Sequence, residues 1–315
     1  MLAHPVPAPE VDLFGHLLAV VAAVSAAAYW FAAGRLWRRG DMWPRWRTVS
    51  FTAGCTGVAW SAISTPPGPP FTAHMIEHLL LGMAAPLLLV LARPLPLALR
   101  ILPPAPRRGL LRLAQARPVG WLVFPPLAAL IDLGGLWLLY RTELFALTHH
   151  HPLWNAVVHA HVLAAGLLLT FSVCQLEPVH RRWSLPLRGV TLLAAGAAHA
   201  VLAKSLYGSP PPATAFATAD LHTGAQVMYY GGDLVEAALG AVLAASWYQA
   251  TGRARAHRRR RSVAGRTPRA ATGLRSRTTA ANRTALCHET SRSYTRTSLS
   301  ADTTGPTSTA EPSGP

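Results

Sequence analysis

Charged side chains are scarce in this sequence of 315 residues. Asp, Glu, Lys and Arg make up 13% of the chain and hydrophobic residues 51%, whereas soluble globular domains carry charge at about 25% of positions. The mean hydropathy is +0.25. So few charged side chains do not cover a water-soluble globule of this size. The composition therefore predicts a protein whose main solvent is lipid.

Cysteine and lysine are also rare. The three cysteines, Cys55, Cys174 and Cys287, are far apart and form no C-x-x-C pair, so neither a disulfide framework nor a thiolate metal clip is indicated. Lys204 is the only lysine, yet the net charge is +16. Most of this excess lies in arginines after residue 250. In a membrane protein this distribution favours anionic lipid, and not nucleic acid, as the partner of the basic segment.

Long apolar runs are abundant. A helix needs about 20 apolar residues to cross the hydrocarbon core of a bilayer, and we identify seven such runs. Several of these runs are separated by proline-rich segments, as at residues 65–70 and 102–106. A helix cannot continue through such segments. We predict an all-α fold, a polytopic bundle of seven transmembrane helices. The predicted spans are residues 12–34, 48–64, 71–92, 119–140, 153–174, 187–207 and 221–249.

The arginines give the predicted bundle one orientation. With the N-terminus outside, the inner loops before the C-terminal segment hold fourteen arginines and the outer loops hold only Arg141, which is the positive-inside pattern. No basic residue precedes the first run, so we expect a retained helix and not a signal peptide. The prediction is a multi-pass protein of a bacterial plasma membrane with its C-terminus inside. The inner-loop arginines are Arg35, Arg38, Arg39, Arg45, Arg47, Arg93, Arg100, Arg107, Arg108, Arg112, Arg117, Arg181, Arg182 and Arg188.

The chain is predicted to have two parts, a transmembrane domain over residues 1–250 and a cytoplasmic tail over residues 251–315. The tail is rich in Arg, Ser and Thr and has almost no large apolar residues. It cannot bury enough surface to offset the entropy lost on ordering, so we predict that it is disordered. Its basic cluster at residues 253–261 is expected to contact anionic lipid head groups.

Histidines gather toward the outer side of the predicted bundle. Ten of the fourteen fall in outer loops or in the outer half of a span, and ionisable groups within a membrane mark a functional site by default. His74 and His78 are four residues apart, so they share one helix face and could share a metal. Imidazole with nearby carboxylate suits copper, zinc or iron. The alternative is that these histidines only hydrogen-bond neighbouring helices.

Other ionisable residues accompany this pair. His159 and His161 point to different faces of their helix, so at most one is expected to meet His74 and His78. Asp132, buried by its position, needs a partner or a proton. Without paired thiolates, imidazoles and thioethers would give a weak and exchangeable copper site, which suits delivery. The remaining candidates are His222 and Asp233 on the last span, the thioethers of Met75, Met83 and Met228, and the outer-loop residues His149, His150 and His151, which we predict to collect the ion.

Residues 72–100 contain the motif His-Met-x-x-His, an apolar run, an Ala-Pro step and the exit Pro-Leu-x-Leu-x-Arg. In these features the segment resembles the multi-spanning CtaG family of cytochrome c oxidase assembly proteins, and the resemblance extends over roughly residues 12–250. It implies a non-enzymatic membrane protein that helps to build haem-copper oxidase and supplies copper to an oxidase subunit in the membrane. It also implies a metal-handling set of His74, His78, His159, His161 and His199, with Asp132 and Asp233 as polar partners.

Three other functions remain open. The string from His74 to His78 is also an H-x-x-E-H pattern, in which Glu77 would be the general base of an intramembrane metallohydrolase, with zinc as its metal. A haem-binding electron carrier could use His78 with His161 or His199 as axial ligands. A proton-coupled transporter should continue its ionisable residues into the inner half of the bundle, where few occur.

Overall fold

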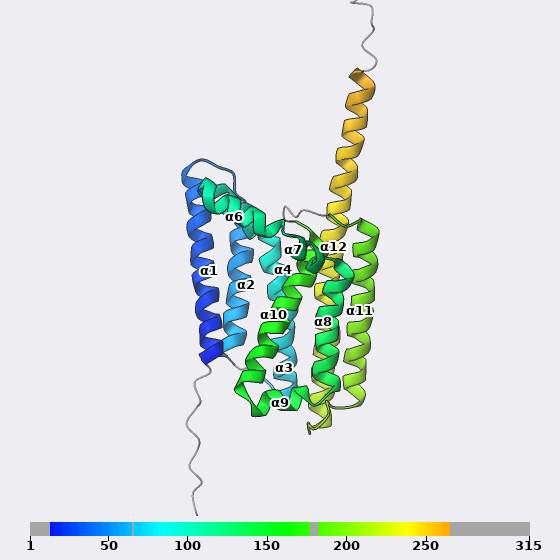
Figure 1. Cartoon of the computed structure of the whole chain (residues 1–315). Coiled ribbons are helices and arrows are strands. Elements are labelled where there is room, and N and C mark those ends of the chain that lie inside the picture. The colour runs from blue at the N-terminus through cyan, green and yellow to red at the C-terminus, as the bar shows by residue number, and fades with distance from the viewer. Residues whose placement is uncertain (1–12, 65, 177–181, 265–315) are drawn as a thin grey trace, which may run out of the picture. The chain divides into compact units, whose positions relative to one another are not determined.

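The computed structural model describes residues 13–64, 66–176 and 182–264, except for the side chains of His149 and residues 253–264. Within these residues every regular element is a helix, so the predicted all-α class is confirmed (Figure 1). The elements are α1 (Leu13–Arg38), α2 (Arg45–Ile63), α3 (Pro70–His78), the π-helix η1 (Leu79–Ala84), α4 (Ala85–Leu91), α5 (Pro94–Ile101), α6 (Pro104–Ala114), α7 (Arg117–Leu122), α8 (Pro125–Arg141), α9 (Leu144–His150), α10 (Pro152–Cys174), α11 (Leu185–Gly208) and α12 (Thr218–Ala264).

Several of these helices are long and apolar enough to cross a membrane. Two of the predicted spans are helices that fall short of that standard: α2 carries threonine, serine and glycine along its length, and α8 has only 17 residues. Both nevertheless run alongside the longer helices, α2 beside α1 and α4, and α8 beside α10 and α11 (Figure 1). The chain is therefore a membrane helix bundle. The five candidate membrane-spanning helices in its described part are Leu13–Arg38, Pro70–Leu91, Pro152–Cys174, Leu185–Gly208 and Thr218–Gly252.

The predicted fourth span is not one continuous helix. Helix α7 ends at Leu122, and α8 begins at Pro125. Proline has no backbone N–H and disfavours helical geometry in the residue before it, so Pro125 and Pro126 cannot extend α7. They are instead tolerated in the first turn of α8. The prediction of a single helix over residues 119–140 is wrong at this break.

Two segments predicted to be irregular are helical. Residues 144–150 form α9 where we expected a loop, and α12 continues to Ala264 where we expected disorder from residue 251. Alanine and arginine account for most of residues 251–264 and are among the best helix formers. The rest of the predicted tail, residues 265–315, lies outside the described residues.

The third span contains a π-helical turn. Pro86 is the second residue after η1, and in a regular α-helix its ring would collide with the carbonyl of Gly82, four residues earlier. The wider i→i+5 turn of η1 relieves that collision. Gly166 of α10 packs against the same carbonyl, because a Cβ added to Gly166 would collide with it. The Ala-Pro step thus accounts for the turn, and a glycine lets α10 approach it.

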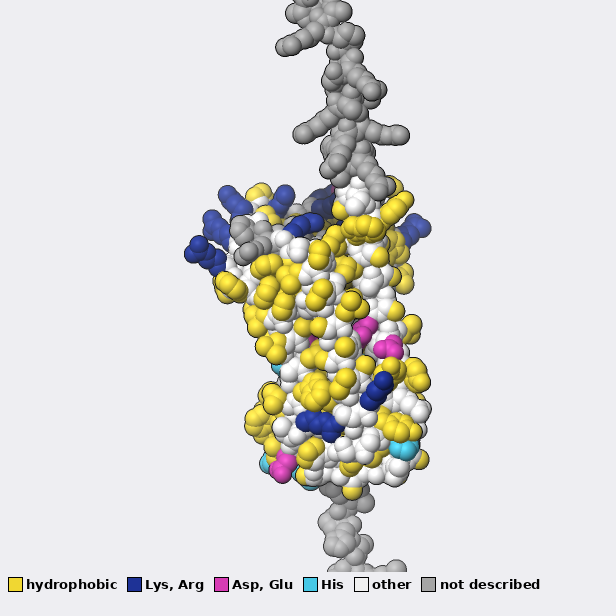
Figure 2. Space-filling model, turned by 90° about the vertical axis from the view of Figure 1, so that its right-hand side faces the viewer, with side chains coloured by type: hydrophobic (Ala, Val, Ile, Leu, Met, Phe, Trp, Pro, Cys, Tyr) yellow, Lys and Arg dark blue, Asp and Glu magenta, His cyan; other side chains and the backbone are white. Residues whose placement is uncertain are grey.

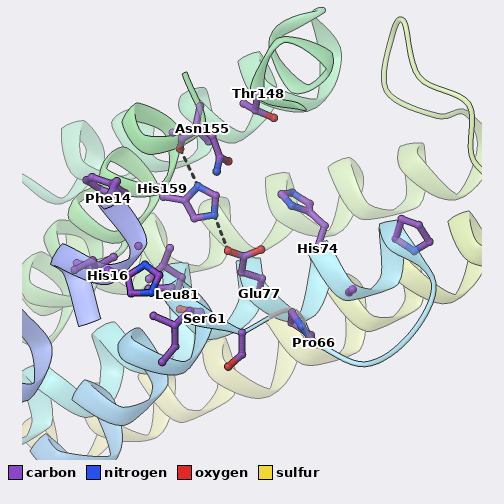
Figure 3. A pocket seen from close by; sticks show the side chains of 18 of the residues that line it. Phe14, His16, Ser61, Pro66, His74, Glu77, Leu81, Thr148, Asn155 and His159 are labelled. Carbon is purple, nitrogen blue, oxygen red and sulfur yellow. Dashed lines mark hydrogen bonds and ion pairs between the residues drawn. The ribbon is translucent and has the colours of Figure 1, made fainter. Parts of the chain in front are cut away.

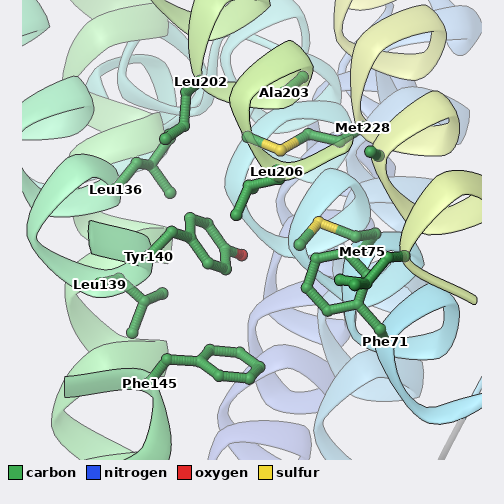
Figure 4. Packing of buried hydrophobic residues seen from close by; sticks show 12 residues of the cluster. Phe71, Met75, Leu136, Leu139, Tyr140, Phe145, Leu202, Ala203, Leu206 and Met228 are labelled. Carbon is green, nitrogen blue, oxygen red and sulfur yellow. The ribbon is translucent and has the colours of Figure 1, made fainter. Parts of the chain in front are cut away.

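Buried apolar side chains join α3, α8, α9, α11 and α12 at the end of the bundle that contains α9. Tyr140 lies at the centre of this cluster, fully buried, with its ring directed toward Phe71 and Met75 on α3 (Figure 4). Phe145 of α9 packs edge-on against Phe71. This core fixes the position of α3 relative to its neighbours.

The start of α3 is capped by a residue from α12. Pro69 offers no side-chain cap, and the Asp220 carboxylate instead accepts hydrogen bonds from the backbone N–H groups of Phe71 and Thr72, both at 2.9 Å, and from the Thr72 hydroxyl at 2.7 Å. The carboxylate satisfies N–H groups that a helix start leaves unpaired and complements the positive end of the helix dipole. The last long helix therefore anchors the helix that carries His74 and His78.

Exposed arginines collect at the opposite end of the bundle. Helix α6 lies there, beside the C-terminal end of α1, and α7 lies at the same end, while α9 lies at the other end (Figure 1). Figure 2 shows a group of Lys and Arg side chains near one end and apolar surface along the length of the bundle. The exposed residues of the arginine-rich end include Arg35, Arg38, Arg45, Arg107 and Arg112.

Candidate functional site

An open cavity of about 740 Å³ lies at the arginine-poor end of the bundle (Figure 3). Its wall comes from the start of α1, the end of α2, α3, α9 and α10. His16, His74, Glu77 and His159 supply its ionisable side chains. We call this space the outer cavity.

His159 and Glu77 form the closest polar contact in the outer cavity. His159 Nδ1 lies 2.8 Å from the carbonyl oxygen of Asn155, and Nε2 lies 2.6 Å from Oε1 of Glu77 (Figure 3). A carbonyl only accepts, so Nδ1 donates, and the contact with Glu77 then needs a second proton on the imidazole or on the carboxyl group. A metal cation can replace that shared proton, because metal ligands bind in their deprotonated forms.

His74 lies beside this pair, held by aromatic residues. Its Nε2 is 3.0 Å from the Tyr140 hydroxyl, and its ring packs edge-on against Phe145 with 4.8 Å between centroids. The imidazole lines the outer cavity together with Glu77, three residues further along α3. The core cluster therefore orients one of the predicted metal ligands.

His78 faces a second and much smaller space. A buried pocket of about 30 Å³, here called the inner pocket, is lined by His78, Met83, Asp132, His199 and Glu236 among leucines. The His78 and His199 rings have centroids 6.2 Å apart and planes at 30°. Nδ1 of His199 lies 3.6 Å from Oε1 of Glu236. A haem between His78 and His199 does not fit this pocket, because sites for ligands of drug size need about 300 Å³ or more.

A third cavity of about 20 Å³ adjoins both spaces. It shares His74, Glu77 and His159 with the outer cavity, and it shares His78 with the inner pocket. Tyr140 completes its polar lining. Ionisable side chains thus form a continuous series from the open cavity to the buried pocket.

The other predicted residues lie elsewhere. His161 is exposed and lies against Gly135 of α8, where an added Cβ would collide with its ring. His222 stacks on Tyr207 with 3.9 Å between centroids. Asp233, His150 and His151 are exposed, and the side chain of His149 is not described. The five predicted metal-handling histidines therefore lie at three places.

A preformed metal cage is absent from the described part of the chain. No group of three or more His, Cys, Asp or Glu side chains in the residues described is arranged to hold a metal ion. His74 and His159 share one cavity, and His78 and His199 share another. Lys204 lies over the Tyr229 ring, 5.3 Å from its centroid, in a separate groove. Lys204 therefore does not line the inner pocket, whose wall contains the carboxyl groups of Asp132 and Glu236.

Glu236, Tyr140 and Asp220 are site residues that sequence reasoning missed. Glu236 lies three residues after Asp233 in an apolar run, so a survey of every ionisable residue within the spans finds it. Tyr140 is the last residue of the predicted span 119–140, and Asp220 directly precedes the predicted span 221–249. Their roles depend on contacts with α3, far away in the sequence, and these carry no local signal.

One family model matches most of the chain. Residues 27–250 match the model of the cytochrome c oxidase caa3 assembly factor family (Caa3_CtaG). Among curated proteins, the uncharacterized proteins Mb0105 of Mycobacterium bovis and MT0111 of Mycobacterium tuberculosis are each 30% identical over 197 residues, which is 59% of this chain and 30% of theirs. The uncharacterized protein ML1998 of Mycobacterium leprae is 29% identical over 179 residues, 54% of this chain and 27% of its own.

The chain thus covers only 30% of the length of the first of these relatives. No solved structure matches it. The matched residues include those that line the inner pocket and most of those that line the outer cavity. Only the outer-cavity residues before residue 27 lie outside the match. On this match, the chain belongs to the family of cytochrome c oxidase caa3 assembly factors.

Proposed function

We propose that this protein handles copper for a respiratory oxidase at the outer cavity, as a non-enzymatic assembly factor. The observation that carries the proposal is the set of His74, Glu77 and His159 in the wall of one open cavity. Two imidazoles and a carboxylate suit copper, and without thiolates they would hold it weakly. Copper is here a cargo that is bound and passed on.

The proposed topology makes this cavity accessible from outside the cell. If α2 and α8 complete a seven-span bundle of a bacterial plasma membrane, α5, α6 and α7 lie on the cytoplasmic side with their arginines, as the positive-inside rule requires. The outer cavity, at the opposite end, then opens to the exterior. The basic segment after residue 250 would contact anionic lipid head groups, and we assign no role in binding nucleic acid.

Transfer of copper to the oxidase would depend on the small number of protein ligands in the outer cavity. A site with few protein donors leaves coordination positions on the ion open to a docking oxidase subunit, which can then take the ion over through its own ligands. Release from such a site requires no bond-making chemistry in the assembly factor. The second proton held between His159 and Glu77 would return when the ion leaves.

The test is a double substitution, His74→Ala with His159→Ala, in cells grown at low copper. We expect the copper content of the isolated oxidase, measured by mass spectrometry, to fall several-fold while the amount of oxidase protein stays unchanged. Added copper should restore oxidase activity in part. His222→Phe is the matched control, because it removes an imidazole at the same end of the bundle that stacks on Tyr207 outside the cavity. Normal oxidase copper in the double variant would overturn the proposal.

A further inference from the structure

The inner pocket contains two imidazole nitrogens without partners. Nε2 of His78 and Nε2 of His199 are buried and have no hydrogen-bond partner among the described residues. The two residues are only 5% and 3% exposed. Buried polar atoms without partners are uncommon in native proteins, and each one calls for an explanation such as an ion.

The orientation of His199 leaves a lone pair at the unpartnered nitrogen. Its Nδ1 faces the Glu236 carboxyl group at 3.6 Å, so a proton on Nδ1 is favoured and Nε2 is then unprotonated. Metal-ligating histidines commonly have such a carboxylate at the second ring nitrogen, which fixes tautomer and ring orientation. Glu236 is therefore a positioning residue for His199.

A sulfur donor lies in the wall of the same pocket because of the π-helical turn. His78 and Met83 are five residues apart, and at 3.6 residues per turn they would lie about 140° apart around an α-helix. The i→i+5 turn of η1 brings such residues toward one side. Both residues line the inner pocket.

We propose that His78, Met83 and His199 bind one cuprous ion in the inner pocket, a second station behind the outer cavity. Imidazole suits copper, and a thioether favours the cuprous ion. A pocket of about 30 Å³ has room for one ion. Asp132 and Glu236 line the pocket, and their carboxyl groups supply the negative charge that a cation buried in a membrane requires.

Ligands of the two stations line one common space. The small third cavity is lined by His74 and His159 of the outer cavity and by His78 of the inner pocket. The proposed route of the ion from the outer cavity to His78 therefore runs through this space. The inference rests on the proposed copper function, since the outer cavity would load the buried site.

The test is an anaerobic titration of the purified full-length chain in detergent with cuprous ion, against a colorimetric chelator. The wild type should bind two ions per chain. Met83→Leu, which preserves the apolar volume, should lose one of them or weaken its binding at least tenfold, and X-ray absorption should lose the copper–sulfur signal. Met75→Leu is the matched control, since this buried methionine packs in the apolar core cluster, and it should retain both ions and the sulfur signal.

The outcomes separate the two proposals. If the wild type binds a single ion that is lost in the His74→Ala, His159→Ala variant and unaffected by Met83→Leu, the outer cavity stands and the inner site is refuted. A wild type that binds no copper refutes both. A copper–sulfur signal that Met83→Leu leaves unchanged also refutes the inner site.

Discussion

At the scale of single residues, the histidines differ in what their two ring nitrogens contact. His159 has both nitrogens engaged, one by a backbone carbonyl and one by Glu77. His199 has one nitrogen facing Glu236 and the other unpartnered within the described chain. His222 is instead stacked on a tyrosine ring. These differences are the reason why we propose metal handling for His159 and His199 and a packing role for His222.

Glu77→Gln separates metal delivery from hydrolysis. A metallohydrolase that uses Glu77 as its general base should lose at least a hundredfold in rate, a typical contribution of such a group. A delivery protein should lose the carboxylate ligand and yet retain most oxidase assembly, because the amide can still hydrogen-bond His159 and both imidazoles of the proposed copper site remain. Oxidase activity of membranes, normalised to oxidase protein, is the measurement. Loss of assembly as complete as in the His74→Ala, His159→Ala variant would contradict this expectation.

Tyr140→Phe tests the support of His74. The substitution removes the hydroxyl that lies 3.0 Å from Nε2 and should destabilise the protein by about 1 kcal/mol. A lowered midpoint of thermal unfolding in detergent, together with weaker copper capture at the outer cavity, is the expected result. Tyr207→Phe, which preserves the ring that stacks on His222, should leave copper capture unchanged.

At the scale of helices, α3 depends on contacts from distant parts of the chain. Asp220→Ala should destabilise the bundle by about 2 kcal/mol, because it leaves buried N–H groups of Phe71 and Thr72 unpaired. Thermal unfolding in detergent measures this loss. Asp233→Ala serves as the control, since Asp233 is exposed on the same helix. Equal stability of the two variants would show that the cap does not anchor α3.

Gly166→Ala tests the approach of α10 to the π-helical turn. The added methyl group would collide with the Gly82 carbonyl, and such overpacking costs about 1–3 kcal/mol. We expect a lower unfolding midpoint and a loss of copper binding at the inner pocket. Gly134→Ala, where an added Cβ meets no atom within 4 Å, should leave both unchanged.

At the scale of the whole molecule, the arginine distribution predicts the orientation in the membrane. Alkaline phosphatase fused after residue 151, next to α9, should be active, because this site is expected to lie outside the cell. Green fluorescent protein fused after Ala114, at the end of α6, should fluoresce, because that site is expected to lie in the cytoplasm. Alkaline phosphatase and green fluorescent protein fusions measure the two sides. The reverse pattern would place the outer cavity inside the cell and refute delivery from outside.

The sequence predicted more of the fold than of the site. Hydropathy and proline breaks located the long helices closely, because burial in lipid leaves a strong local signal; α10 begins and ends within one residue of its predicted span. They failed at Pro125, where the predicted apolar run continues across the break between α7 and α8. The site was harder, because the placement of His161 against Gly135 and of Glu236 near His199 depends on how helices pack, which their spacing along the chain does not specify.

The cap from Asp220 has a consequence for biogenesis. The carboxylate and the two amides it binds are separated by 148 and 149 residues, so the ribosome must make almost the whole bundle before the amides find their acceptor. A nascent chain therefore lacks the cap of the histidine-bearing helix until α12 emerges, and the copper loading that we propose would be a late event in biogenesis.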